Sequence, residues 1–300
     1  MCSPQEIIYK AVSASFKCIG LIPRELGPRV GGFLGHIAFL ADKRHREIAL
    51  NNLTLAYGDE KSPREIRILA KNVFENLGKI VFEIGWFSTL SRNDFDKYFR
   101  IDGLSHYTNA VAKNKGVLIL TAHLGNWELL TAFSGMTGYP VDVIYRPLDF
   151  RPLDKFFADQ RTRFGGKLIP KNRSMRKILK TLQEKQALGF LMDQNVDWYD
   201  GVFVTFFGRR ACTNKGLALL ALKTGAPVVP MFLLREEYGF RVEIGPEVPL
   251  IKTGDKRKDI EANTQQYNDI IEALVRRYPD QWFWVHRRWK TRPYKPWPKT

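Results

Sequence analysis

The stretch from Gly116 to Leu130, GVLILTAHLGNWELL, constrains the fold of this chain more than any other. Residues Val117 to Thr121 are a short, continuous apolar run after a Lys-Asn-Lys-Gly turn, which is typical of an interior strand in a sheet covered on both faces. The next residues, Ala-His-Leu-Gly-Asn, predict a turn, and WELLTAF has helical character. The sequence therefore predicts a strand, a turn and a helix, with an ionisable pair, His123 and Glu128, at the junction.

The spacing of this pair limits how the two side chains can meet. On one continuous helix, at about 100° a residue, they would lie about 140° apart and could not touch. They converge only if His123 lies on the turn and Glu128 on the first helical turn, with backbone freedom at Gly125 and an N-cap at Asn126. That geometry suits an imidazole held by a carboxylate, with its second nitrogen free to accept a proton. In the alternative interpretation, the histidine caps a buried turn and the glutamate complements the helix dipole.

From about residue 100 onward, predicted strands and helices alternate. The candidate strands are Gly116–Ala122, Val141–Tyr145, Lys167–Pro170, Leu188–Met192, Pro227–Leu234 and Phe240–Ile244. The candidate helices are Asn126–Ser134, Pro152–Phe164, Met175–Lys185, Asn214–Thr224 and Asp259–Arg277. This alternation predicts an α/β fold, with a largely parallel central sheet flanked by helices, over residues 101–300.

Residues 1–100 are predicted to form an N-terminal helical layer against that sheet. Ser62, Pro63 and Glu65 have the spacing of an N-cap, a first-turn proline and a capping-box glutamate, so a helix should begin there. Residues 5–20 carry an apolar stripe at helical spacing, Ile8, Val12, Phe16 and Ile19. This stripe predicts either a helix in a bilayer interface or a helix packed on the core.

Composition limits the classes of partner that the protein can bind and the cellular compartment in which it works. The net charge is +16, from 47 Lys and Arg against 31 Asp and Glu, so an anionic partner is expected: nucleic acid, an anionic membrane surface, or an acidic protein or substrate. No apolar run reaches the about 18 residues of a membrane-spanning helix, and no secretory signal is recognised. Three scattered cysteines and the absence of HExxH predict a reduced compartment and no metal site.

Three further polar groups are candidates for a site. Arg146 follows a predicted strand and Arg161 lies on the next helix, where either could also be an ordinary surface arginine. Asp193 closes an apolar strand, and the ends of parallel strands are where open α/β sheets bind ligands, although an aspartate there could equally begin a turn. Gly208, Arg209 and Arg210 precede a predicted helix, which is typical of an anion pocket or of a plain capped loop.

The C-terminal stretch from Pro279 to Pro293, PDQWFWVHRRWKTRP, interleaves aromatic with basic side chains. Such a pattern favours either base stacking with phosphate contacts or interfacial tryptophans beside lipid phosphates. No helix-turn-helix, RNP or zinc-finger pattern supports nucleic acid.

Taken together, these strings resemble the lauroyl and myristoyl acyltransferases of lipid A biosynthesis, a branch of the His-x4-Asp/Glu glycerolipid acyltransferase superfamily. The string His-Leu-Gly-Asn-Trp-Glu after an apolar strand is similar to the superfamily motif. The block ending in Asp193-Gln194, the Phe-Gly-x-x-Ala-x-Thr block from Phe207 and the terminal W-x-H-R-R-W-K-T-R-P block follow in the order typical of the branch. The resemblance covers residues 20–293.

The resemblance implies an O-acyltransferase that needs no cofactor. It would move a fatty acyl chain from acyl carrier protein, or from acyl-CoA, to a hydroxyl of a lipid A precursor. His123 would be the general base, and Glu128 would fix its tautomer. The remaining implied roles are oxyanion stabilisation or substrate positioning by Gly125, Arg161, Asp193 and Arg146, and lipid phosphate binding by Arg209, Arg210, Arg287 and Arg288.

The implied partners are the acyl donor, a lipid acceptor and a membrane surface, and not nucleic acid. The implied location is the cytoplasmic face of the bacterial inner membrane, with peripheral or monotopic attachment. Three alternatives stay open from the sequence: acylation of another lipid, such as a lysophospholipid, glycolipid or aminolipid; a nucleic-acid-binding module; and a catalytically silent relative that binds lipid.

Overall fold

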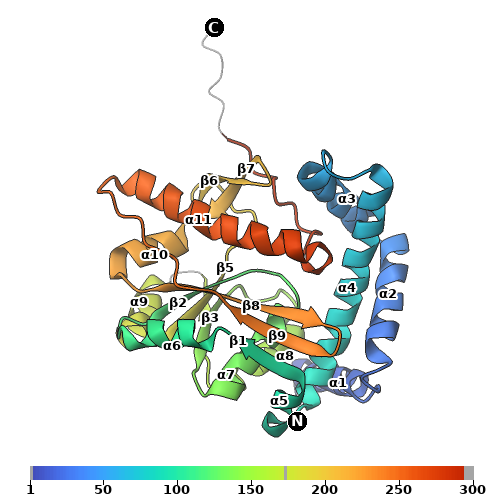
Figure 1. Cartoon of the computed structure of the whole chain (residues 1–300). Helices are drawn as coiled ribbons and strands as arrows, with labels where there is room; N and C mark the ends of the chain where they lie inside the picture. The colour runs from blue at the N-terminus through green and yellow to red at the C-terminus, as the bar shows by residue number, and fades with distance from the viewer. Residues whose placement is uncertain (1–2, 172–173, 294–300) are drawn as a thin grey trace.

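Four helices form the N-terminal layer of the computed structural model, which describes residues 3–171 and 174–293. They are α1 (Pro4–Gly20), α2 (Gly27–Ala41), α3 (Lys43–Tyr57) and α4 (Pro63–Thr89), and they stand along one side of the sheet (Figure 1). The predicted start of α4 is confirmed, because the Ser62 hydroxyl accepts the Glu65 N–H while the Glu65 carboxylate accepts the Ser62 N–H. None of the described helices is both long and apolar enough to cross a membrane.

Helices α2 and α4 pack at very short range because glycines face one another. A Cβ added to Gly78 of α4 would lie 2.0 Å from the Gly31 carbonyl oxygen of α2, so only glycine fits there. With its small residues turned inward, α2 carries its larger apolar side chains on the outer face. The exposed members of this face are Val30, Phe33, Leu34, Ile37 and Leu40.

The predicted apolar stripe of α1 packs mainly on the body of the protein. Phe16 stacks on Phe156 of α8 (Arg151–Thr162), with ring centroids 4.3 Å apart, and Val12 and Ile19 lie against the same cluster. Ile8, at the start of the stripe, stays 42% exposed. The exposed apolar surface of the layer is therefore mostly on α2.

A seven-stranded sheet forms the core of the remaining chain. Its order is β1-β9-β8-β2-β5-β3-β4, and neighbouring strands are parallel except β8 and β9. The strands are β1 (Phe99–Asp102), β2 (Val117–Thr121), β3 (Val141–Tyr145), β4 (Leu168–Pro170), β5 (Ala187–Leu191), β8 (Val228–Glu236) and β9 (Gly239–Ile244). The predicted α/β fold with a largely parallel sheet is confirmed, and each predicted strand is present within a few residues of its expected bounds.

The two faces of the sheet are buried in two separate apolar clusters. Along β2, Leu118 and Leu120 enter one cluster and Val117 and Ile119 the other, as the two-residue period of a strand requires. Helices α10 and α11 cover the first face, and α6, α7 and α8 cover the second (Figure 1). Helix α4 reaches both clusters, with its N-terminal half on the first and its C-terminal half on the second.

The remaining elements join or cover the strands. They are η1 (Arg92–Asp94), α5 (Phe95–Tyr98), α6 (Leu104–Ala112), η2 (Trp127–Thr131), α7 (Ala132–Thr137), α9 (Met175–Gln183), α10 (Gly216–Thr224), α11 (Lys256–Arg277) and η3 (Pro279–Gln281). The helix expected over Asn126–Ser134 is thus a 3-10 turn followed by a short α-helix. Asn126 makes no capping hydrogen bond to it.

One predicted loop is an antiparallel hairpin, β6 (Gly201–Phe206) and β7 (Arg209–Asn214). Its two-residue turn, Phe207-Gly208, has positive φ at both positions, 51° and 68°. Phenylalanine is an unusual residue for such a turn, in which Asn-Gly or Asp-Gly is the typical signal. The expectation that Arg209 and Arg210 lie in a loop before a helix is therefore wrong: both are on β7, and α10 begins later, at Gly216.

Candidate active site

His123 and Asp193 follow two strands that are neighbours in the sheet. β2 pairs in parallel with β5, with Thr121 opposite Leu191, so both chains leave the sheet at the same edge. Residues that follow the carboxyl ends of adjacent parallel strands are brought side by side, which is where open α/β sheets place their sites. The sheet topology therefore joins a histidine and an aspartate that are 70 residues apart in the sequence.

The Asp193 carboxylate holds His123 at two atoms. His123 Nδ1 lies 2.9 Å from Asp193 Oδ1, and the His123 backbone N–H donates to Oδ2 at 3.0 Å. The indole N–H of Trp282 donates to the same Oδ2 at 2.8 Å. Since a carboxylate only accepts hydrogen bonds, Nδ1 carries the imidazole proton and Nε2 is left with its lone pair.

The charge of Asp193 is maintained although its side chain is almost fully buried, 1% exposed. Burial by itself would raise the pKa of this carboxyl, but the electrostatic interaction with His123 and the hydrogen bonds from His123 and Trp282 outweigh it and lower the pKa below its ordinary value. Asp193 is therefore ionised at neutral pH and can stabilise a protonated imidazole.

Glu128, the expected partner of His123, makes a different contact. Its two oxygens accept from Arg161 Nη2 and Nε, at 2.7 and 2.8 Å, in a bidentate pair. Trp127 Nε1–H donates to the same carboxylate at 3.0 Å. The expectation that Glu128 fixes the His123 tautomer is wrong, because Asp193 occupies Nδ1. The structure instead joins two candidate residues, Glu128 and Arg161, as an ion pair in which both side chains are less than one-fifth exposed.

The loop after His123 packs closely against β8, and its backbone N–H at Gly125 already has a hydrogen-bond acceptor. Gly125 has a φ of +62°, and a Cβ at this position would lie 1.9 Å from the Leu233 carbonyl oxygen. Its N–H donates to the Gln281 carbonyl at 3.0 Å. The predicted backbone freedom at Gly125 is thus used to approach β8, but its N–H is not available to a substrate oxyanion.

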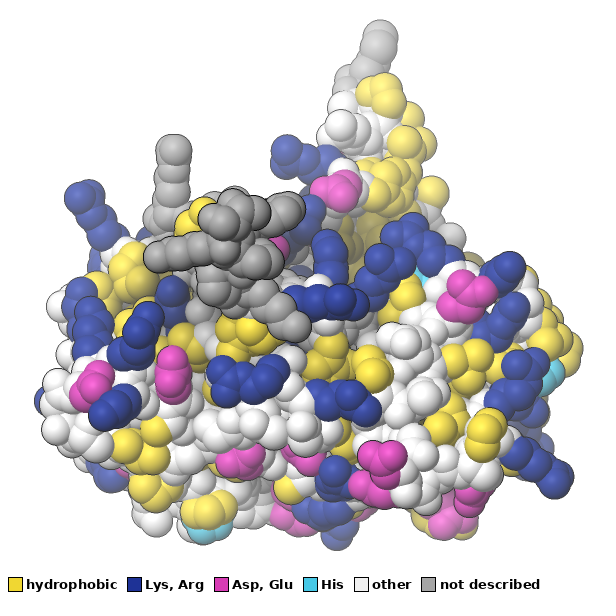
Figure 2. Space-filling view, turned by 90° about the horizontal axis from the view of Figure 1, so that it is seen from above, with side chains coloured by type: hydrophobic (Ala, Val, Ile, Leu, Met, Phe, Trp, Pro, Cys, Tyr) yellow, Lys and Arg dark blue, Asp and Glu magenta, His cyan; other side chains and the backbone are white. Residues whose placement is uncertain are grey.

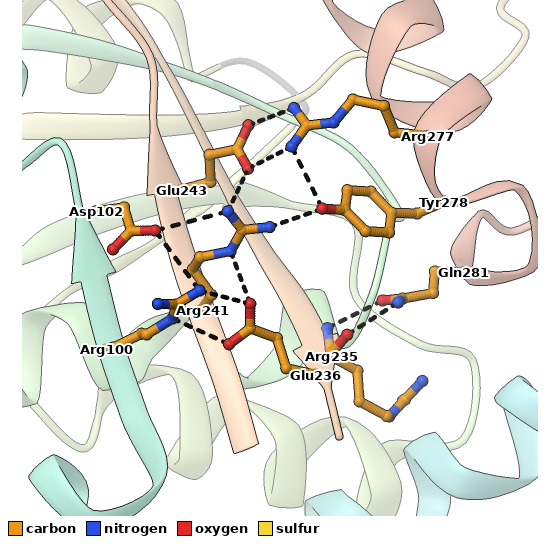
Figure 3. A network of polar contacts seen from close by, with 9 residues as sticks. All are labelled: Arg100, Asp102, Arg235, Glu236, Arg241, Glu243, Arg277, Tyr278 and Gln281. Atoms are coloured by element: carbon orange, nitrogen blue, oxygen red, sulfur yellow. Dashed lines mark hydrogen bonds and ion pairs between the residues drawn. The ribbon is translucent and has the colours of Figure 1, made fainter. Parts of the chain in front are cut away.

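A buried ion pair anchors the next residue of the loop. Asn126, fully buried, donates from Nδ2 to Glu83 Oε2 of α4 at 2.9 Å. Glu83 is itself buried and paired with Arg235 at the end of β8. Arg235 and Gln281 exchange two further hydrogen bonds, backbone N–H to Oε1 at 2.9 Å and Nε2–H to carbonyl at 3.0 Å (Figure 3). Hydrogen bonds and an ion pair therefore connect helix α4, strand β8 and the C-terminal segment, and Asn126 joins the histidine loop to them.

The C-terminal segment from Trp282 to Arg292, called here the strap, closes the other side of the site. Phe283 N–H donates to the His123 carbonyl at 3.0 Å, and Leu124 forms a bridge with Trp282. The strap follows α11. The end of this helix is fixed by a hydrogen bond in which the Tyr278 hydroxyl accepts from Arg241 Nη2 at 2.7 Å (Figure 3). The aromatic residues of the strap thus form part of the site itself.

His286 of the strap faces the same cavity as His123. Its Nε2 accepts the Asn195 backbone N–H at 2.9 Å. Burial lowers the pKa of His286 to about 4, so the ring is neutral at neutral pH and its proton lies on Nδ1. A third group, the Gln194 side-chain amide, lies 3.5 Å from His123 Nε2.

A cavity of about 1090 Å³ opens beside this cluster. Its polar lining includes His123, Glu128, Arg161, Gln194 and His286. Most of the remaining wall is apolar and comes from several elements: Ile119, Leu130, Val141, Val143, Ile178, Phe190, Leu219, Leu220 and Met231. The lining also includes the charged residues Arg146, Asp149, Lys171, Asp200 and Lys215. An apolar wall beside a polar cluster is the arrangement that binds a long apolar ligand with one reactive group.

The other predicted arginines are divided between surface and interior. Arg146 lies at the rim of the cavity with its side chain 81% exposed. Arg209 and Arg210 are exposed on β7, where Arg209 donates to the Leu55 carbonyl. Arg287 is exposed on the strap.

Arg288 is fully buried and cannot reach a lipid phosphate. It donates to the Cys212 carbonyl at 3.0 Å, to Thr213 Oγ1 at 2.6 Å and to Asn268 Oδ1 at 2.9 Å. Burial lowers its pKa to about 10, so it stays charged at neutral pH. The prediction that Arg288 binds phosphate is therefore wrong, and its observed contacts connect the strap to β7 and α11.

Sequence reasoning missed Gln194, Trp282 and His286 as residues of the site. The signal for Trp282 and His286 was the density of aromatic and basic residues in the strap, which indicated importance but not position. For Gln194 the signal was its place next to Asp193 at a strand end.

Comparison with known proteins gives one consistent family. The family model described as bacterial lipid A biosynthesis acyltransferase matches residues 2–291. The lipid A biosynthesis palmitoleoyltransferase of Escherichia coli is 30% identical over 273 residues, covering 89% of this chain and 85% of that protein. The lipid A biosynthesis lauroyltransferase of the same organism is 27% identical over 268 residues, covering 88% and 85%. A phosphatidylinositol mannoside acyltransferase of Mycolicibacterium smegmatis is 25% identical over 189 residues, covering 62% and 60%.

Proposed function

This chain belongs to the bacterial lipid A biosynthesis acyltransferase family, and we propose that it transfers a fatty acyl chain from a thioester donor to a hydroxyl of a lipid A precursor, with His123 as general base. The observation that carries the proposal is the orientation of His123. Its Nδ1 is held by Asp193, and its free Nε2 lies beside Gln194 in an apolar cavity of about 1090 Å³.

The proposed step begins with the acceptor hydroxyl against His123 Nε2. The imidazole takes the hydroxyl proton as the oxygen attacks the thioester carbonyl, and Asp193 stabilises the resulting imidazolium. When the tetrahedral intermediate collapses, the C–S bond breaks, and the imidazolium returns the proton to the departing thiolate. The products are an ester and a free thiol, so no covalent acyl-enzyme is required.

The developing oxyanion needs donors that are not already engaged. The Gln194 amide is one, because it lies next to Nε2 and lines the cavity. Arg161 is another, since its bonds to Glu128 use Nε and Nη2 and leave Nη1 without a partner among the described residues. One such donor contributes a factor of about 10² to 10³ in rate in other enzymes.

The donor is proposed to be acyl carrier protein, with acyl-CoA as the alternative. The net charge of +16 favours an acidic macromolecular donor, because opposite charges speed the encounter of two proteins. The apolar wall of the cavity, which includes Ile119 and Met231, would hold the acyl chain during transfer.

We place the protein at the cytoplasmic face of the inner membrane, as a peripheral or monotopic protein. What supports this is the outer face of α2, where Phe33, Leu34 and Leu40 are 64%, 56% and 59% exposed. Contiguous exposed apolar residues of this kind mark interaction surfaces, and an amphipathic helix can lie in a bilayer interface without crossing it.

A second candidate acceptor is a different bacterial lipid. What supports it is the similarity to a protein named phosphatidylinositol mannoside acyltransferase.

The test is transfer of a radiolabelled acyl chain from acyl carrier protein, or from CoA, to a panel of lipids. Wild type should label the lipid A precursor, His123→Gln should label nothing, and His106→Gln, on α6 away from the site, should behave as wild type. Label on another lipid alone would replace the acceptor, and equal labelling by His123→Gln would overturn the mechanism.

A further inference from the structure

A second cavity, of about 750 Å³, lies between the start of α3 and the strap. Its lining includes five cationic side chains and a single carboxylate, that of Glu47. The cationic residues of this basic groove are Lys43, Arg44, Arg287, Lys290 and Arg292. The mechanism proposed above uses none of them.

The basic groove has fixed walls. Buried Asn52 of α3 donates from Nδ2 to the Trp284 carbonyl at 2.7 Å and to the His286 carbonyl at 2.5 Å. These bonds hold α3 against the strap, so the cations on the two sides face the same space. The strap is also the wall shared with the catalytic cavity, because Phe283 and His286 line that cavity while Arg287 and Trp289 line the groove.

Contacts within the fold account for only part of the positive charge at this place. Lys43 lies 3.9 Å from Glu47, and Arg46 donates to the Phe39 and Leu40 carbonyls at the end of α2. In the part of the chain that the structure describes, the side chains of Arg44, Arg287 and Lys290 make no hydrogen bond or ion pair. Three unpaired cations that line one groove favour an anionic ligand.

The position of the groove indicates where the anion comes from. The exposed apolar face of α2 ends at Leu40, and the groove begins at Lys43, with only Ala41 and Asp42 between. The face of the molecule seen in Figure 2, which looks down on the α3 and β6–β7 end of Figure 1, carries Lys and Arg side chains over its centre. Apolar residues next to clustered cations match a bilayer, in which phosphate groups lie just outside the hydrocarbon.

We propose that the basic groove binds the phosphate group of an anionic lipid at the membrane surface. This inference deepens the proposed function and rests on it only in assigning that lipid as the acceptor. The lipid phosphate would accept from Arg44, Arg287 and Lys290, across the strap from His123, while the lipid chains stay beside α2.

The test is co-sedimentation of the full chain with two kinds of vesicle of matched surface charge: phosphatidylcholine with phosphatidic acid, and phosphatidylcholine with oleic acid. Wild type should prefer the phosphatidic acid vesicles. The double variant Arg287→Gln/Lys290→Gln should lose that binding by about tenfold or more, since each basic side chain near an anionic membrane contributes about fivefold.

The matched control is Lys256→Gln/Arg257→Gln, which removes two exposed cations from the start of α11. It should bind as wild type does. An equal loss in the control, or equal binding of wild type to oleate vesicles, would overturn the phosphate site in favour of general electrostatics. If Arg287→Gln/Lys290→Gln binds vesicles as wild type does but transfers acyl chains more slowly from acyl carrier protein to a detergent-dissolved acceptor, the groove would be assigned to the acidic donor instead. Because vesicle binding needs no catalysis, these results are separate from success or failure of the acyl transfer assay.

Discussion

Asp193 and His123 are joined by two hydrogen bonds, from the imidazole Nδ1 and from the backbone N–H, although neither residue lies near the other in the sequence. The double contact fixes both the tautomer and the direction of the ring. His123, the proposed base, is therefore positioned by the pairing of β2 with β5 and not by the helix that follows it.

Glu128 should act with Arg161 and not with His123. We expect Glu128→Gln to lower kcat/KM, because Arg161 loses a bidentate partner and its charge in the cavity is no longer balanced. In a double-mutant cycle, Glu128→Gln and Arg161→Gln should be coupled by about 0.5–3 kcal/mol, as directly contacting residues are. Glu128→Gln and Asp193→Asn should be closer to additive; strong coupling of that second pair would place Glu128 back on His123.

The buried pair of Glu83 and Arg235 should contribute to both stability and activity. Glu83→Gln leaves the Arg235 charge in the interior, and breaking a buried pair in this way costs about 3–5 kcal/mol of the free energy of unfolding. Urea denaturation measures this loss. Because Asn126 also bonds to Glu83, kcat should fall as the histidine loop loses an anchor.

A control on the same helix separates this effect from general damage to α4. Glu75→Gln removes a partly exposed carboxylate from α4 and should change the free energy of unfolding by about 0.5 kcal/mol or less. A Glu83→Gln protein as stable and as active as the Glu75→Gln protein would show that the buried pair does not support the site.

His286 should make the protein less stable in mild acid. Its pKa in the folded state is about 4, below the ordinary value of 6.5, so the unfolded chain binds the proton first as the pH falls. The contribution is complete above about pH 6.5 and is lost progressively towards about pH 4. The Tm of wild type should therefore fall more steeply across this range than the Tm of His286→Gln. Identical Tm profiles for the two proteins would show that His286 is not held neutral.

The sequence predicted the sheet well because buried parallel strands are continuous apolar runs, as at Val117–Thr121 and Ala187–Leu191. It missed β1, whose four residues include two charges, and the β6–β7 hairpin, whose Phe207-Gly208 turn lacks the usual residues. It also placed His123 correctly at a strand end, since the following Leu-Gly-Asn could not continue the strand.

The partners of the candidate site residues could not be predicted in the same way. Nearness in sequence favoured Glu128 for His123, but strand order decides which strand ends meet, and that order depends on contacts across the whole chain. The basic residues of the strap showed the same problem. Arg287 and Arg288 are neighbours in sequence, yet one is exposed in the basic groove and the other is fully buried.

The most direct measurement of the central claim is kcat for acyl transfer by Asp193→Asn, with Asp142→Asn as the matched control. Both aspartates are buried at the sheet, but Asp142 accepts from Lys167 N–H and Thr181 Oγ1 and makes no contact with His123. An amide in place of Asp193 favours the wrong imidazole tautomer, and we predict a fall in kcat of about 10³ to 10⁴ with the fold retained. Asp142→Asn should lower Tm and leave kcat within about threefold of wild type. Transfer by Asp193→Asn at a rate similar to that of Asp142→Asn would contradict the account.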